Sequence, residues 1–330
     1  MPCGSRPGRP RLGNEFAPLS ARGYNEGRQR GEIVGHLSAR VTPLWCTDPT
    51  QPPLPYCETV RITDVLARRR WTLERFGFTP RKVVARMRNR TEPMILCVSL
   101  PKAGTHLLER ALCLHPRLYR RLVPTLSEAN INRGRRFDAL LDSLRPGQVV
   151  LCHLAFTPEY RRWVTERHIK CLFLIRDPRD IVVSQSYYIA GKRGHPLHEL
   201  FANVPDLKER LKIAIQGDLP HGLESVGQRL AQFAGWLDAS DLVIRFEDLV
   251  DSEGGSDPGV QLATLRALYR SIGLFPDDQF FADLVRQLVS SVSPTFRTGK
   301  TGGWRAHFDP ELEELFRAVA GTQLAPYGYE

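Results

Sequence analysis

The sequence predicts a three-layer α/β fold, in which a central parallel sheet is flanked by helices. Two observations predict it. Four short apolar runs with β-branched residues alternate with longer stretches of helical periodicity, and no hairpin turn joins consecutive runs. Strands separated by helices pair in parallel, because each crossover returns the chain to the same end of the sheet. The expected strands are 94–100, 148–154, 170–175 and 242–246.

Helical patterns fill the intervals between these strands and continue on both sides of them. Between the strands we expect helices at 105–115, 137–143, 178–190, 197–214 and 223–239. Outside them we expect helices at 65–76, 80–87, 260–272 and 277–289. A last helix starts at Asp309-Pro310, because Asp is a good N-cap and proline fits the first helical position.

The chain divides into a tail and one domain. Residues 1–58 are rich in Gly, Pro and Arg and show no lasting period, which predicts a poorly packed N-terminal extension. Residues 59–330 are expected to form a single domain, since 42% apolar residues suffice for a sizeable core. Of the net charge of +10, +4 lies in residues 1–40, where seven arginines face three glutamates. The domain is therefore only mildly basic, which argues against a nucleic-acid partner.

Cysteine usage and hydropathy predict a cytoplasmic protein with no membrane partner. The seven cysteines include no C-x-x-C pair, and Cys97, Cys152 and Cys171 fall inside apolar strands, where a reduced thiol acts as a small hydrophobic group. None of the 9 histidines shows metal-ligand spacing, so we expect no metal. No apolar run approaches the ~18 residues of a membrane span, and the N-terminus lacks the apolar core of a signal peptide.

The segment 94–106 runs from an apolar strand through a short turn into a helix, which is how P-loop-like α/β proteins bind a phosphate. The turn lacks the early glycine of a nucleoside-triphosphate loop, and Lys102 is followed by Ala103 instead of Ser or Thr. The hydroxyl that would hold Mg²⁺ is therefore missing. Lys102, the backbone N–H groups and Thr105 predict a site for one terminal phosphate bound without metal.

The other strands also end in chemically useful side chains: His153, Arg176, and the pair Glu247 and Asp248. The carboxyl ends of parallel strands meet at one edge of a sheet, so this pattern predicts an active site there. Arg176 and Ser184, about two turns into the next helix, are suited to a second anion, but an ordinary ion pair and a small helix residue explain them equally well. A histidine at a strand end is, by itself, more often a hydrogen-bonded core residue.

Three segments, in the same order along 94–308, resemble the motifs of sulfotransferases that use 3′-phosphoadenosine 5′-phosphosulfate (PAPS). LPKAGT at 100–105 resembles the family's 5′-phosphate loop, and RDPRD at 176–180 with Ser184 resembles its 3′-phosphate motif. FRTGKTGGWRAHF at 296–308 resembles the C-terminal segment that closes over the 3′-phosphate. The resemblance favours a PAPS-dependent sulfotransferase of the cytosolic or bacterial type.

The resemblance also implies site residues. His153 would be the general base, Lys102 would stabilise the leaving group, and Ser184 would hold Lys102 back until an acceptor is bound. The residues expected to bind PAPS are Lys102, Ala103, Gly104, Thr105, His106, Arg176, Ser184, Phe296, Arg297, Thr298 and Gly299. His106 stands where the family has a second Thr, and Thr298 stands where it has Lys. Phe296 is a candidate for stacking on adenine, because Leu107 replaces a Trp that often does so.

The implied reaction is metal-free transfer of a sulfuryl group from PAPS to a hydroxyl or amine of a small-molecule acceptor, leaving adenosine 3′,5′-bisphosphate (PAP). The acceptor would be selected by 118–136 and 191–222, which do not identify it. Glu247, Asp248, Trp304 and Phe308 are interpreted as structural. A P-loop nucleoside-triphosphatase or kinase-like phosphotransferase and a catalytically silent nucleotide-binding protein remain as alternatives. The oligomeric state, a homodimer included, stays open.

Overall fold

The computed structural model describes residues 62–88, 91–131, 136–289 and 300–330, and the expected extension 1–58 lies outside them. The strands of the described ranges form one parallel sheet in the order β2-β4-β1-β5-β6, with β3 beside β4. The expected α/β class and parallel sheet are confirmed. The four predicted strands are β1 (Ile95–Ser99), β4 (Gln148–His153), β5 (Lys170–Ile175) and β6 (Leu242–Arg245).

Two further strands, β2 (Tyr119–Arg120) and β3 (Leu126–Ser127), are too short to show a period of two in the sequence. Both lie along β4, where Ser127 is the register partner of His153. At the centre of the sheet, Ser99 at the end of β1 pairs with Leu174. The carboxyl ends of β1, β4 and β5 therefore lie next to one another.

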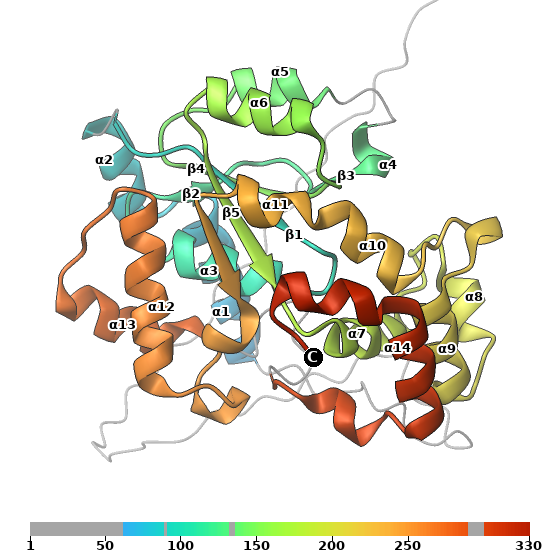
Figure 1. Ribbon diagram of the computed structural model, residues 1–330. Helices are drawn as coiled ribbons and strands as arrows, with labels where there is room; N and C mark the ends of the chain where they lie inside the picture. The colour runs from blue at the N-terminus through green and yellow to red at the C-terminus, as the bar shows by residue number, and fades with distance from the viewer. Residues whose placement is uncertain (1–61, 89–90, 132–135, 290–299) are drawn as a thin grey trace, which may run out of the picture. The chain divides into compact units, whose positions relative to one another are not determined.

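Each face of the sheet packs on its own core, and the alternation within β1 separates them. Leu96 and Val98 belong to a core shared with helices α7, α9, α10 and α14, while Ile95 and Cys97 belong to a core shared with α3, α12 and α13. Figure 1 shows α12 and α13 on one side of the strands, and α7, α9 and α14 on the other. All five residues of β1 are buried, which explains why this strand reads as a continuous apolar run.

The helices agree with the expected ones, with four differences. They are α1 (Ile62–Arg75), α2 (Pro80–Arg88), α3 (Thr105–Cys113), α4 (Glu128–Ile131), α5 (Phe137–Asp142), α6 (Pro158–Glu166), α7 (Pro178–Gly191), α8 (His198–Ala202), α9 (Leu207–Gln216), α10 (Val226–Phe233), α11 (Gly235–Ala239), α12 (Pro258–Ser271), α13 (Asp278–Leu288) and α14 (Pro310–Leu324). The expected 197–214 is divided into α8 and α9, and 223–239 into α10 and α11. Helices α4 and α6 were not expected, although Thr157 caps α6 through a 3.0 Å bond from the Tyr160 N–H. Within the described ranges, no helix is long and apolar enough to cross a bilayer.

Candidate active site

The turn between β1 and α3 has an unusual backbone. Lys102 and Gly104 both have positive φ values, 74° and 104°, and the Ala103 N–H donates to the Leu100 carbonyl over 3.1 Å. A lysine in this region costs of the order of 1 kcal/mol, a strain that is common at functional sites. Gly104 is also required by space, since a Cβ there would lie 2.3 Å from Cδ2 of Phe246.

Helix α3 begins beside this turn and presents its first N–H groups without a side-chain cap, because Gly104 occupies the N-cap position. The adjacent hydroxyl is fixed: Thr105 Oγ1 lies 2.7 Å from Oγ of Ser99. Uncapped N–H groups and the positive end of the helix dipole favour an anion at this point. The arrangement supports the phosphate site that the sequence predicts at Lys102 to Thr105.

His153, at the end of β4, is held in one tautomer by the end of β1. Its Nδ1 lies 2.7 Å from the Ser99 carbonyl oxygen, which can only accept, so Nδ1 carries the proton. Nε2 is then the unprotonated nitrogen. Burial lowers the pKa of His153 to about 4, although the bond to Ser99 acts in the opposite direction. Lys102, His106 and Arg120 lower this pKa further. The imidazole is therefore neutral at pH 7, with Nε2 able to accept a proton.

Arg176, at the end of β5, connects the first and third motifs. Its Nη1 donates to the Lys102 carbonyl and its Nη2 to the Lys300 carbonyl, each over 3.2 Å. The guanidinium carbon lies 4.2 Å from the centre of the Phe246 ring. Arg176 also has the carboxylate partner of an ordinary ion pair, since Asp180 Oδ2 lies 3.9 Å from its Nη2. Arg176 thus lies beside the phosphate loop, where a second anion could be bound.

The start of α7 holds the C-terminal motif. Asp177 caps α7, accepting a 2.9 Å bond from the Arg179 N–H. One turn later, the Asp180 carboxylate accepts the N–H groups of Gly302 (2.8 Å) and Trp304 (2.9 Å). Burial raises the pKa of Asp180, partly offset by Arg176 and these N–H groups. The predicted binding residues Phe296, Arg297, Thr298 and Gly299 lie outside the described residues.

The Lys102 side chain contacts α7 on the helix face that carries Ser184. Ser184 is half-buried on α7, one turn beyond Asp180. The Lys102 ammonium lies over the ring of Tyr188, another turn along, with Nζ 3.8 Å from the ring centre. Tyr188 was not among the predicted site residues, although its spacing of four from Ser184 places it on the same helix face.

His106, which departs from the family pattern, forms part of a charged network. Its Nδ1 lies 2.8 Å from Oε2 of Glu109 in the next turn of α3. Glu109 is buried and also contacts Arg120 at 3.2 Å and Arg75 at 3.3 Å. Burial alone would raise the pKa of Glu109, but the His106 bond and the two arginines bring it below its ordinary value. The carboxylate is therefore ionised and orients His106. Leu107, the other departure, packs against the core of α3, α12 and α13.

Three of the residues interpreted as structural, Glu247, Trp304 and Phe308, make contacts that fit this interpretation. The Glu247 carboxylate accepts the Asp177 N–H and the Tyr329 hydroxyl, both over 2.8 Å. Trp304 and Phe308 are buried, with ring centres 5.5 Å apart. Glu247 is thus engaged as a hydrogen-bond acceptor, and the aromatic pair anchors the C-terminal motif. Among the described residues, no group of three or more His, Cys, Asp or Glu side chains could hold a metal ion.

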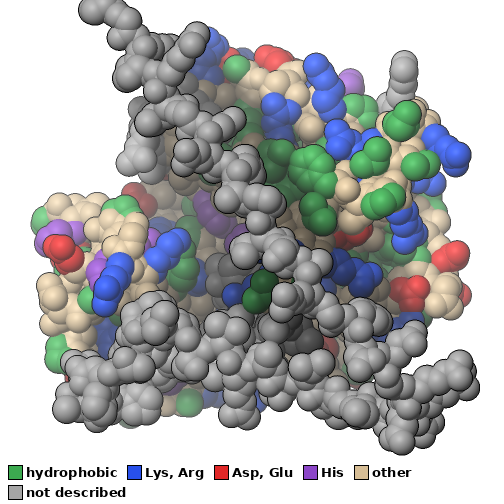
Figure 2. All heavy atoms as spheres, turned by 180° about the vertical axis from the view of Figure 1, so that it is seen from behind, with side chains coloured by type: hydrophobic (Ala, Val, Ile, Leu, Met, Phe, Trp, Pro, Cys, Tyr) green, Lys and Arg blue, Asp and Glu red, His purple; other side chains and the backbone are tan. Residues whose placement is uncertain are grey.

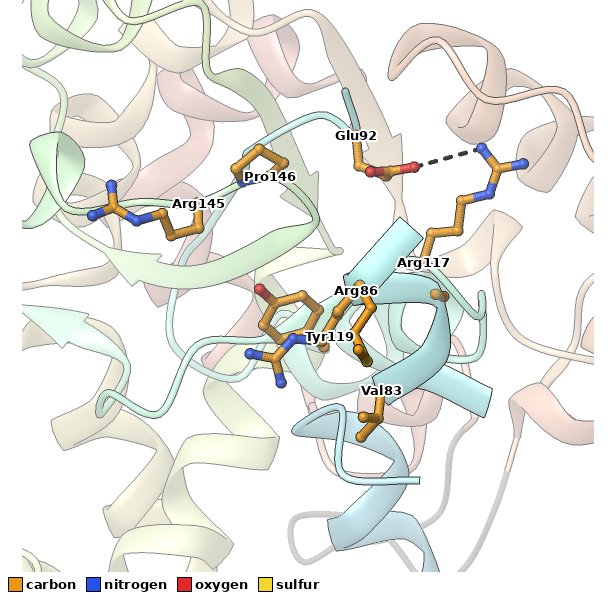
Figure 3. Close-up of a pocket in the computed structure, with 9 residues that line it drawn as sticks. Val83, Arg86, Glu92, Arg117, Tyr119, Arg145 and Pro146 are labelled. Atoms are coloured by element: carbon orange, nitrogen blue, oxygen red, sulfur yellow. Dashed lines mark ion pairs between the residues drawn. The ribbon is translucent and has the colours of Figure 1, made fainter. Parts of the chain in front are cut away.

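A pocket of about 500 Å³ lies at the opposite ends of the strands, between α2 and the segments that precede β1, β2 and β4. Figure 3 shows Arg86 beside Tyr119, and Arg117 paired with Glu92 at 3.5 Å. Its lining includes no histidine or lysine. By contrast, histidine and basic side chains line a hollow on the face drawn in Figure 2. The predicted site residues Lys102, His153 and Arg176 lie at the carboxyl ends of the strands, away from the pocket between α2 and the strand starts.

Comparisons with known proteins find similarity to sulfotransferases. No family model matches the chain. Mouse sulfotransferase 2A2 is 23% identical over 272 residues, which cover 75% of this chain and 90% of that protein. Mouse sulfotransferase 2A6 is 21% identical over 254 residues, covering 71% and 85%. Among solved structures, mouse sulfotransferase SULT7A1 complexed with PAP has a TM-score of 0.51 at 19% identity, covering 72% of this chain and 89% of that one. The last likeness supports the fold alone.

Proposed function

We propose that this chain, a member of the PAPS-dependent sulfotransferase family, transfers a sulfuryl group from PAPS to a hydroxyl or amine of a small-molecule acceptor. One observation carries the proposal: Ser99 connects the phosphate loop to the base. Its hydroxyl bonds to Thr105 Oγ1 in the loop, and its carbonyl accepts the Nδ1 proton of His153. The loop and Nε2 are thereby fixed relative to one another, which transfer between two bound substrates requires.

The described residues fit the donor. The N–H groups at the start of α3, the Lys102 ammonium and the Thr105 hydroxyl would hold the 5′-phosphosulfate, with His106 beside them. Arg176 and Ser184 would hold the 3′-phosphate. From the resemblance alone, Arg297 and the backbone at Gly299 would complete that second site. Phe296 and Thr298 remain predicted contacts.

The proposed roles follow from charge and tautomer. His153 Nε2 accepts the acceptor's O–H or N–H proton as the new bond to sulfur forms and the bond from sulfur to the 5′-phosphate oxygen breaks. The pair of electrons of that broken bond stays on the phosphate, where the Lys102 ammonium stabilises the growing negative charge. Positioning and charge stabilisation suffice for such a transfer, as in phosphoryl transfer, and no step needs a metal.

Incubation with labelled PAPS and a panel of phenols, alcohols and amines tests the proposal. We expect EDTA-insensitive transfer to at least one acceptor, lowered at least about 100-fold by His153→Ala and by Lys102→Ala. His168→Asn and Lys170→Ala are matched controls, because both residues lie at the opposite end of β5, where His168 is exposed and Lys170 pairs with Asp241. Activity abolished by EDTA would favour a magnesium-dependent phosphotransferase instead. Tight PAP binding without turnover of any acceptor would favour a silent binding protein.

The magnesium-dependent alternative is opposed by contacts of the fourth strand end. Both carboxylate oxygens of Glu247 are engaged, one by the Asp177 N–H and one by the Tyr329 hydroxyl. The pKa of that tyrosine is raised above its ordinary range, chiefly by burial and then by the Glu247 charge, so its hydroxyl stays protonated and keeps donating. Glu247 is therefore engaged in connecting the end of β6 to the start of α7 and to the C-terminus.

A further inference from the structure

The ring of Tyr188 lies at the centre of a cluster of basic groups at the end of α7. The Lys102 ammonium is 3.8 Å from the ring centre, and the Lys192 ammonium is 4.8 Å from it. Lys192 also donates to the Tyr188 hydroxyl, and the His195 ring meets the tyrosine ring edge-on at 5.9 Å. An ammonium within about 6 Å of an aromatic centre is attracted by the negative face of the ring.

The position of Tyr188 on α7 matters because the helix also carries the residues of the 3′-phosphate motif. Asp180, Ser184 and Tyr188 are spaced four residues apart, so they follow one another along one helix face. At 1.5 Å per residue, Tyr188 lies about 6 Å beyond Ser184 and about 12 Å beyond Asp180. The Lys102 side chain therefore contacts α7 well past the end at which Arg176 and Asp180 meet.

We propose that Tyr188 is a positioning residue that competes with the donor's 5′-phosphate for the Lys102 ammonium and restrains it until the phosphate is bound. This inference rests on the proposed function. The phosphate site is built from the start of α3, whereas the ring belongs to α7, so the ammonium leaves the ring face to neutralise the phosphate. The lost attraction is worth about 0.5–1 kcal/mol for a partly exposed pair, which corresponds to a roughly two- to five-fold penalty on binding.

Titration calorimetry with PAP tests the competition without requiring turnover. Tyr188→Leu removes the ring, and PAP is expected to bind about two- to five-fold more tightly than to the wild type. Tyr188→Phe keeps the ring and should leave the affinity of the wild type. In a Lys102→Met background, the same Tyr188→Leu change should leave PAP affinity unchanged, because the ammonium that the ring attracts is then absent.

The sign of the change separates positioning from packing. A ring that only packed would give weaker PAP binding when removed, so an unchanged or weaker affinity of a folded Tyr188→Leu variant overturns the proposal. If that variant does not fold, as judged by circular dichroism, Tyr188→Met replaces it with a longer apolar side chain and the same expectation. A wild-type chain that binds neither PAP nor PAPS would instead refute the proposed function on which the inference stands.

A second measurement observes the contact itself. Ring currents of Tyr188 shift the ε-methylene protons of Lys102 upfield, and saturating PAP should return them toward the position of an ordinary lysine. The resonance is assigned by its absence in Lys102→Arg. An upfield shift that persists unchanged at saturating PAP would show that the ammonium never leaves the ring, and would contradict the competition.

Discussion

Asp180 ties the C-terminal motif to the start of α7, so its replacement tests whether that tie builds the second phosphate site. Its two carboxylate oxygens accept the Gly302 and Trp304 N–H groups at 2.8 and 2.9 Å. In Asp180→Asn, one oxygen can still accept, but the amide nitrogen cannot, so one N–H loses its partner. The remaining bond also loses the assistance of the negative charge.

The size of the effect follows from these two losses. A hydrogen bond to a charged group contributes about 1.5–3 kcal/mol and a neutral one about 0.5–1.5 kcal/mol, so the substitution costs about 2–3 kcal/mol in total. If that free energy holds residues 300–304 beside Arg176, PAP must supply it on binding. The dissociation constant for PAP is then expected to rise about 30- to 140-fold.

Isothermal titration with PAP, together with urea unfolding, measures both quantities. Glu247→Gln is the matched control, because Glu247 also accepts two hydrogen bonds near the start of α7 but has no such bond to residues 300–304. It should lower the free energy of unfolding while changing PAP affinity less than about threefold. Equal losses of PAP affinity in the two variants would refute the reasoning, since the effect would then be general loosening of the strand ends.

Three further predictions concern the base, the loop and the scaffold. Since the pKa of His153 lies at about 4, kcat/KM should change less than about twofold from pH 7 to pH 5, whereas a histidine of pKa 6.5 would lower it about 25-fold. The unfolded chain binds this proton first, so stability, followed by thermal melting, should fall as the pH drops from 6.5 to 4. Gly104→Ala should weaken PAP binding at least about tenfold by calorimetry, because φ is 104° and the new Cβ meets Phe246. Lys82→Met should cost about 1–3 kcal/mol in urea unfolding, since the buried Nζ donates to the Cys113 and Leu118 carbonyls.

The sheet could be predicted because β1, β4 and β5 are buried on both faces and therefore consist of continuous apolar runs. The short strands could not, because two residues carry no period. The division between α8 and α9 is not predicted by periodicity, because the helical pattern continues across it. Pro205, which cannot donate a backbone hydrogen bond, is the residue that indicates it. Asp206 then caps α9, accepting from the Lys208 N–H over 3.0 Å.

The site was predictable to the extent that it depends on strand ends. His153, Arg176 and the loop at Lys102 come together because parallel topology requires it. What the sequence could not give are partners that depend on contacts between distant segments. Asp180 binds N–H groups more than 120 positions away, and Glu109 meets Arg75 and Arg120 from other elements. The spacing of Tyr188 was visible, but not that Lys102 points at it.

Phe246 connects the two parts of the candidate site. The contact that the ring makes here needs only its face: the Arg176 guanidinium stacks on it at 4.2 Å, which leaves the N–H groups of its edge directed at the Lys102 and Lys300 carbonyls. The edge of the same ring occupies the space that a Cβ at Gly104 would need. A single aromatic side chain thus contacts both the turn of the proposed 5′-phosphate loop and the arginine proposed for the 3′-phosphate.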